Sequence, residues 1–88
     1  MKTITPVSVL TDGGLKQATI LNAYAVNVSL NDSAIFVYFL ISEDLKNLSS
    51  GNLVMKGQDY QDWEQDIFAW DWIAEKLGVT ITGDYVQN

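Results

Sequence analysis

The chain contains the stretch Gln58-Asp-Tyr-Gln-Asp-Trp63-Glu-Gln-Asp-Ile-Phe68-Ala-Trp70-Asp-Trp72-Ile-Ala-Glu-Lys-Leu-Gly78, which holds all three tryptophans and six of the eleven acidic residues. We predict that this stretch forms the one substantial helix. Asp59 is suited to be the N-cap. The carboxylate of Asp62, in the first turn, interacts favourably with the free N–H groups and with the positive end of the helix dipole. Lys76 in the last turn and Gly78 after it predict a left-handed C-cap.

Helical spacing divides the apolar residues of this stretch between two sides. The larger stripe, which we expect to face a sheet, consists of Tyr60, Trp63, Ile67, Trp70, Ala74 and Leu77, with Ile73 at its edge. Phe68 and Trp72 are four residues apart and point to roughly the opposite side, where they contact each other. Either the strands or the C-terminal tail fold over this pair, or the pair contacts another chain, because large exposed aromatic side chains mark interfaces.

The acidic residues of this stretch all precede its first basic residue, Lys76; they are Asp59, Asp62, Glu64, Asp66, Asp71 and Glu75. A solvated helix face explains this pattern, and an electrostatic surface for a basic partner is the alternative. Asp62 and Asp66 are one turn apart and can attract a cation weakly, but the loop spacing of an EF-hand is absent. We predict no specific metal site and name Asp62 and Asp66 as candidate contacts with a partner.

The N-terminal third of the chain has the pattern of antiparallel strands. We predict strands over residues 3–10 and 17–30, joined by the turn Thr11-Asp12-Gly13-Gly14. Pro6 lacks an amide donor, so the first strand lies at a sheet edge or has Pro6 on an unpaired side. The second strand is long, and we expect a bulge near residues 22–23.

Residues 34–41, Ala-Ile-Phe-Val-Tyr-Phe-Leu-Ile, are apolar at every position, which is typical of a central strand. A tight turn at residues 31–33 is expected to pair this strand with the preceding one. One face is expected to take the helix; its members are Ile35, Val37, Phe39 and Ile41. The other face, with Phe36, Tyr38 and Leu40, then needs its own cover. That cover is either a sheet that coils into a half-barrel or a partner.

Residues 42–50 are polar, and we expect a loop there with one helical turn capped at Ser42. Short strands are predicted at residues 52–56 and 79–82, on either side of the helix. Together these patterns predict a single α+β domain over residues 1–88. It consists of a small antiparallel β-sheet of about four to five strands packed against one C-terminal aromatic-rich helix.

The composition excludes several classes of function. The chain has no cysteine, no histidine and no arginine, so it lacks disulfides, thiolate chemistry, Cys-based zinc sites and histidine bases. No two carboxylates are placed to flank a cleft, and no glycine-rich phosphate motif occurs. We therefore predict no enzyme, no catalytic residue and no cofactor. The net charge of −6 argues against direct binding to nucleic acid, whose phosphates attract lysine and arginine.

The N-terminus and the apolar runs bear on membrane association. Met1-Lys2 leads into an alternating strand rather than a continuous apolar segment. The longest apolar run, residues 34–41, is too short to span a bilayer. We expect a soluble protein made in the cytoplasm, without membrane contact.

The segments Gly57-Gln-Asp-Tyr-Gln-Asp-Trp63 and Trp72-Ile-Ala-Glu-Lys-Leu-Gly-Val-Thr-Ile-Thr82 resemble small proteins encoded among the structural genes of tailed bacteriophages. The strand Thr5-Pro6-Val-Ser-Val9 and the central hairpin fit this resemblance, which covers most of the chain. Its motifs are structural rather than catalytic, so no functional residue is carried over. The resemblance implies a virion component, made in the host cytoplasm and repeated in a symmetric assembly.

Two functions from different classes follow. The first is a non-enzymatic interaction or structural module, such as a capsid, head-fibre or tail accessory subunit, that self-associates or docks on a larger assembly. Its expected partner-binding residues are Phe68, Trp72, Phe36, Tyr38, Asp62 and Asp66. The alternative is a small acidic inhibitor that mimics nucleic acid and blocks a basic groove, as some phage anti-defence proteins do, with the six acids of the helix as its working residues.

Overall fold

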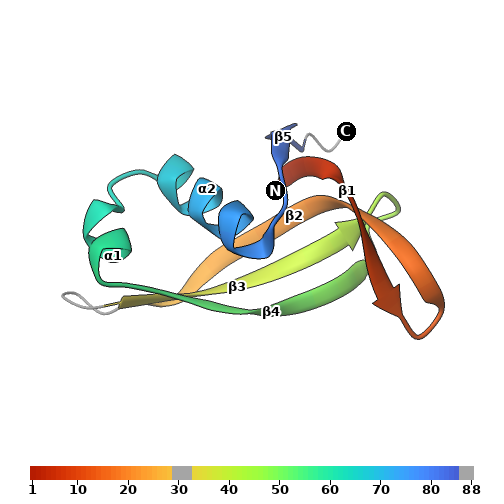
Figure 1. Cartoon of the computed structure of the whole chain (residues 1–88), viewed down its shortest axis with the longest axis horizontal. Coiled ribbons are helices and arrows are strands. Elements are labelled where there is room, and N and C mark those ends of the chain that lie inside the picture. Colours follow the sequence, from red (N-terminus) through yellow and green to blue (C-terminus); the bar gives the residue numbers. More distant parts are fainter. Residues whose placement is uncertain (29–32, 86–88) are drawn as a thin grey trace.

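The computed structural model describes residues 1–28 and 33–85. The elements follow in the order β1 (Lys2–Thr11), β2 (Gly14–Val28), β3 (Ser33–Ser42), β4 (Asn47–Lys56), α1 (Gln58–Asp62), α2 (Asp66–Leu77) and β5 (Ile81–Asp84). The five strands form one antiparallel sheet in the order β4-β3-β2-β1-β5, and both helices lie on the same side of it (Figure 1). The predicted α+β class and the sheet are confirmed.

Turn chemistry sets the strand pairing. Thr11 pairs with Gly14 across a two-residue loop, and Gly14 has a φ of 99°, which residues with a side chain rarely adopt. The predicted β1–β2 hairpin is confirmed. β1 lies between β2 and β5, so it is not an edge strand. Pro6 lies between Thr3 and Val7, where the register with β2 shifts. The absence of an amide N–H at Pro6 therefore removes no regular hydrogen bond of the sheet.

Other strand details differ from the prediction. β2 and β3 pair antiparallel as expected, but residues 31–32 of the predicted turn lie outside the described residues. The register shifts of β2 against β3 occur around residues 19 and 26 rather than 22–23. β4 begins at Asn47 instead of residue 52, because pairing with β3 holds its polar N-terminal half in the sheet. β5 begins at Ile81 instead of residue 79.

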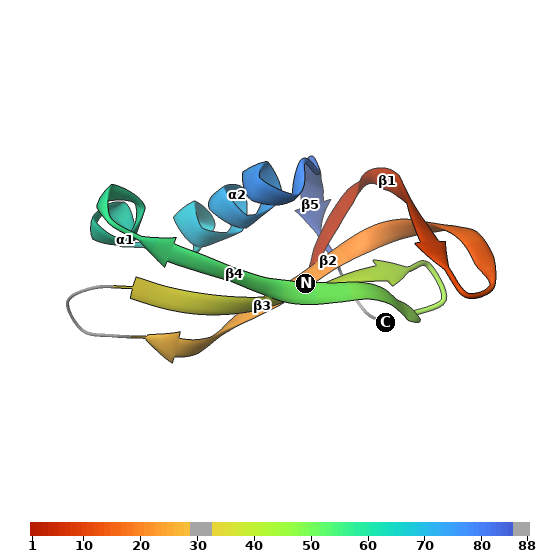
Figure 2. The same ribbon diagram turned by 60° about the horizontal axis from the view of Figure 1, so that its bottom comes forward.

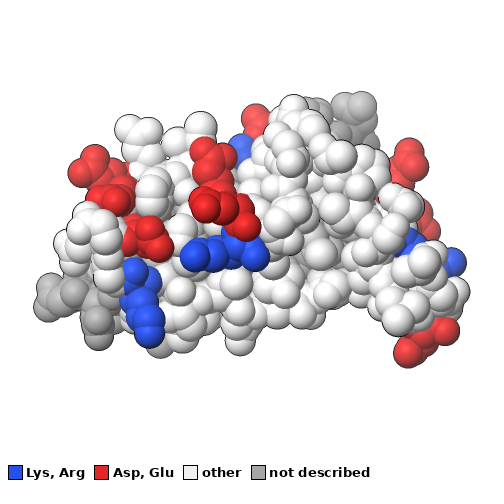
Figure 3. Space-filling model, in the orientation of Figure 1, with Lys and Arg blue, Asp and Glu red and all other residues white. Residues whose placement is uncertain are grey.

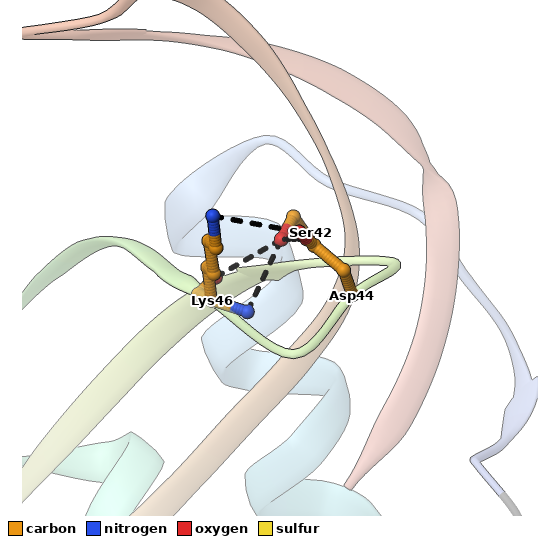
Figure 4. A network of polar contacts seen from close by, with 3 residues as sticks. All are labelled: Ser42, Asp44 and Lys46. Carbon is orange, nitrogen blue, oxygen red and sulfur yellow. Dashed lines mark hydrogen bonds and ion pairs between the residues drawn. The ribbon is translucent and has the colours of Figure 1, made fainter.

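The β3–β4 connection is a turn held by one side chain. The Ser42 hydroxyl donates to the Asp44 carboxylate and accepts a hydrogen bond from the backbone N–H of Lys46 at 3.2 Å (Figure 4). The hydrogen bond from Ser42 lowers the pKa of Asp44. The predicted helical turn capped at Ser42 is not observed: Ser42 ends β3, and its hydroxyl closes a hairpin turn that leads directly into β4.

The predicted single helix is divided in two. α1 and α2 are separated by residues 63–65, and Trp63 has extended dihedral angles with φ −76° and ψ 96°. Gly57, not Asp59, precedes α1 as its N-cap residue. The prediction for the C-terminus is confirmed, because Gly78 is left-handed with φ 72° and its N–H bonds to the carbonyls of the last turn.

The interruption changes which residues of α2 face the sheet. The buried residues of α2 are Ala69, Trp72, Ile73 and Ala74. Ile67, predicted to be in the core stripe, is 65% exposed, and Trp72, predicted to point away from the sheet, is 8% exposed. The predicted stripe was counted at helical spacing from Tyr60 and Trp63. That spacing does not apply to α2, because residues 63–65 interrupt the helix.

The core lies between α2 and one face of the sheet (Figure 2). Its buried residues are Ile4, Leu21, Ala34, Phe36, Met55, Ala69, Trp72 and Ile73. Phe36 on β3 packs edge-on against Trp63, with 5.2 Å between ring centroids, and lies 6.1 Å from the ring of Trp72. The face of β3 that takes the helix is therefore the one with Phe36, and the predicted assignment of the two faces was wrong.

Candidate functional site

No helix of the described residues covers the side of the sheet opposite α1 and α2 (Figure 2). At one end of this side Ile20, which pairs with Ile41, is buried at 2% exposure and lies beside Glu43 and Tyr85. Residues paired across neighbouring strands share a face, and this side carries pairs such as Tyr24 with Val37 and Ile35 with Val54. We define the open face by Asn22 and Tyr24 of β2, Ile35, Val37, Phe39 and Ile41 of β3, and Ser50, Asn52 and Val54 of β4. Tyr24 and Val54 are 51% and 52% exposed, and the rings of Tyr24 and Phe39 stack with centroids 6.0 Å apart.

None of the nine residues that define the open face is charged; Lys56 lies beyond Val54 at one end, and Glu43 lies beside Ile20, the pairing partner of Ile41, at the other. The described acids instead occupy hairpin turns, both helices with the linker between them, and β5; they are Asp12, Glu43, Asp44, Asp59, Asp62, Glu64, Asp66, Asp71, Glu75 and Asp84. Figure 3 shows acidic groups over the helical side of the molecule, with lysines beside them. Interface cores are similarly depleted of charge.

The four aromatic residues predicted to bind a partner lie on the helix side of the sheet. Phe36 is 3% exposed and is in the core with Trp72. Tyr38 and Phe68 are half-buried against that core. A Cβ atom on Gly51 would lie 2.7 Å from the Tyr38 hydroxyl oxygen, so the glycine leaves room for this ring. The expectation that Phe36 and Trp72 are exposed was wrong, because both belong to the core. For Tyr38 and Phe68, which keep part of their surface exposed, contact with a partner stays a prediction.

The acids of the helical region have separate neighbours. Asp59 accepts a hydrogen bond of 3.1 Å from the indole N–H of Trp72 and so links α1 to α2. Asp62 accepts one of 2.8 Å from Gln58, whereas Asp66 lines a cleft. Within residues 1–28 and 33–85, no three acidic side chains gather in a group that could hold a metal ion.

The cleft beside Asp66 lies between α2 and β2 and has a volume of about 230 Å³. We define this aromatic cleft by its lining residues: Ala23, Tyr24, Ala25, Phe36, Trp63, Asp66, Ala69, Trp70 and Ile73. Sequence reasoning missed it, because Trp63 was assigned to a continuous helix. The signal that was available is the pair of alanines, Ala23 and Ala25, at alternate positions of a long strand.

An ion pair joins the two ends of the described chain. Lys2 of β1 donates a hydrogen bond to Asp84 of β5, and that bond together with the lysine charge lowers the pKa of Asp84. The Lys2 ammonium also lies 5.6 Å from the centroid of the Trp70 ring. We assign this pair a structural role, because it holds β5 at the edge of the sheet.

Comparison with known proteins adds no further assignment. No family model matches the chain, and neither the curated proteins nor the solved structures give a significant match. Among the described residues, neither helix has the length and apolar character needed to cross a membrane. The open face and the aromatic cleft are therefore the two candidate functional sites of the chain.

Proposed function

We propose that this protein is a non-enzymatic structural subunit that self-associates through its open face. The observation that carries the proposal is the uncovered apolar face of the sheet. The resemblance of residues 57–63 and 72–82 to small proteins of tailed bacteriophages supports a finer assignment, a virion component such as a capsid, head-fibre or tail accessory protein. Its partners are further copies of itself or a larger assembly, rather than nucleic acid.

The chemistry of the open face suits a contact between identical copies. A two-fold contact places the same patch against itself, so a charged patch would bring like charges together. The open face avoids this cost, and its centre presents Tyr24, Val37 and Phe39. Each Å² of apolar surface removed from water contributes about 25 cal/mol. The polar side chains of Ser50 and Asn52 on β4 supply hydrogen-bonding groups next to this centre.

The distribution of charge predicts how salt affects self-association. The net charge of −6 makes two copies repel each other at long range, while the contact itself contains no ion pair to be screened. Salt screens the repulsion, with a Debye length of about 8 Å at physiological ionic strength. Self-association through the open face is therefore expected to persist or strengthen as salt rises.

The test is solution mass by light scattering at low and high salt, with a matched pair of variants. Val54→Lys places a charge on the open face, and Ile67→Lys makes the same change on the exposed side of α2, where the side chain is 65% exposed. We expect the wild-type protein and Ile67→Lys to form a salt-resistant oligomer and Val54→Lys to be monomeric. A wild-type monomer at both salt concentrations, or equal association of both variants, would contradict the proposal.

The acidic inhibitor remains the second candidate. Exposed acids on the helical side, such as Asp62, Asp71 and Glu75, support it. Two observations weigh against it: Asp59 is engaged by Trp72, and lysines lie beside the acids (Figure 3). An inhibitor of this kind binds a basic protein with an affinity that falls steeply with salt. Such binding by a wild-type monomer would favour the inhibitor over the structural subunit.

A further inference from the structure

We propose that the aromatic cleft is a binding site for a quaternary ammonium group. The cleft is formed where α2 begins, between that helix and β2, and Tyr24 is the one residue that it shares with the open face. Four aromatic residues from four different parts of the chain line it: Tyr24 of β2, Phe36 of β3, Trp63 of the linker and Trp70 of α2. Asp66 is the one charged residue among its lining residues.

The space exists because small residues face each other across it. Ala23 and Ala25 of β2 lie on the sheet side, and Ala69 of α2 lies on the helix side. A larger side chain at any of the three would fill the cleft, while the aromatic rings form its other walls. Its volume of about 230 Å³ is below the roughly 300–1,000 Å³ of pockets for drug-sized ligands. The cleft therefore suits a small head group rather than a whole cofactor.

The residues that line the cleft favour a cation that carries no N–H groups. Aromatic ring faces attract cations, and cages of such rings are used to recognise quaternary ammonium ligands. Asp66 adds a negative charge at the cleft. A primary ammonium has three N–H groups that need acceptors, and one carboxylate does not replace the water it would lose. A quaternary ammonium has no such requirement, because its methyl groups can contact the rings directly.

Lys2 does not occupy this site, although it is a nearby cation. Its ammonium lies 5.6 Å from the Trp70 ring centroid, but it is held by Asp84, and Lys2 is not among the residues that line the cleft. The contact shows that one face of Trp70 already accepts a cation.

The experiment is a titration of the full chain with choline and with 3,3-dimethyl-1-butanol, its uncharged carbon analogue. The indole N–H signals of Trp63 and Trp70 are followed by NMR. Trp72 serves as an internal reference, because its N–H is bonded to Asp59 and it does not line the cleft. We expect choline to shift the first two signals and to bind at least fivefold more tightly than the alcohol. Equal binding of the two compounds, or no shift with choline, would overturn the proposal.

Matched variants locate the binding. Asp66→Asn is expected to weaken choline binding severalfold, while Asp71→Asn, the same change at an exposed position of α2 outside the cleft, leaves it unchanged. Ala25→Leu is expected to abolish binding by filling the space from the exposed sheet side. Equal loss in both aspartate variants would mean that net charge alone attracts choline, and would refute the site.

Two sources can supply this group, a small molecule or a methylated lysine of a protein. Peptides carrying trimethyl-lysine or unmodified lysine distinguish them. Tighter binding of the trimethylated peptide than of choline identifies a protein source, and the reverse identifies a small molecule. Either order supports the site, whereas equal binding of the trimethylated and unmodified peptides contradicts it.

Discussion

Replacement of Phe36 by alanine tests which face of β3 supports the fold. Phe36 is 3% exposed and packs between Trp63 and Trp72, so its truncation leaves a cavity that those rings line. Large aromatic truncations in a core cost about 3–5 kcal/mol. A domain of 88 residues has a free energy of unfolding of about 4–13 kcal/mol at roughly 0.05–0.15 kcal/mol per residue. Phe36→Ala is therefore expected to remove a large fraction of the stability.

The matched control is Phe39→Ala, three residues along the same strand but on the open face. Water can occupy the space that Phe39 leaves, so no cavity term is added, and we expect less than half the loss seen with Phe36→Ala. Urea unfolding followed by tryptophan fluorescence measures both, at low protein concentration so that self-association does not contribute. A loss with Phe39→Ala equal to or greater than that with Phe36→Ala would refute the assignment of the two faces.

Three further predictions concern the helices and the chain ends. Gly78→Ala is expected to cost about 1–2 kcal/mol in urea unfolding, because φ at this position is 72°. Asp59→Ala leaves the N–H of buried Trp72 without its acceptor and is expected to cost about 1–3 kcal/mol in the same assay. The lowered pKa of Asp84 means that its ion pair with Lys2 stabilises the fold above about pH 4 and that this contribution is lost as the pH falls through the lower folded-state pKa. We expect the melting temperature to fall less between pH 4 and lower pH in Asp84→Asn than in the wild type, as measured by thermal unfolding at a series of pH values.

Local chemistry predicted much of the sheet. The Asp12-Gly13 loop, the apolar run at residues 34–41 and the left-handed Gly78 each determine their structure through nearby residues, and each is observed. Pro6 falls where the ladder is interrupted, one of the two positions that its missing N–H allows. These features depend on backbone constraints that do not change with the tertiary context.

The structure of the helical region depends on tertiary contacts, which the spacing of apolar residues in the sequence does not reveal. Residues 58–77 have no proline or glycine, so propensity favours one helix, yet Trp63 leaves the helix and packs on Phe36. Burial of a large aromatic pair offsets the loss of a helical turn. The predicted core stripe was wrong, because it assumed that Tyr60 and the residues of α2 belong to one continuous helix. The aromatic cleft was missed for the same reason.

The two faces of β3 were interchanged because a strand that is apolar on both faces has no internal signal for the side that meets a helix. The neighbouring strand decides it. Leu21 and Ala23 of β2 pair with Leu40 and Tyr38, and this face has the small side chains that let α2 approach. The mistake leaves the number of apolar faces unchanged, so the question of what covers the second face, a coiled sheet or a partner, now concerns Ile35, Val37, Phe39 and Ile41.

The size of the helix explains why one face lacks cover. At 1.5 Å per residue, the twelve residues of α2 extend about 18 Å, whereas the molecule is 41 Å long. A helix of this length covers part of one face of a five-stranded sheet, and α2 does not cover the opposite face. The exposed part of the second face, which includes Tyr24 and Val54, is the surface on which the proposed self-association rests. The charges follow a similar division, because six of the ten described acids lie in the helical region and none is among the residues that define the open face.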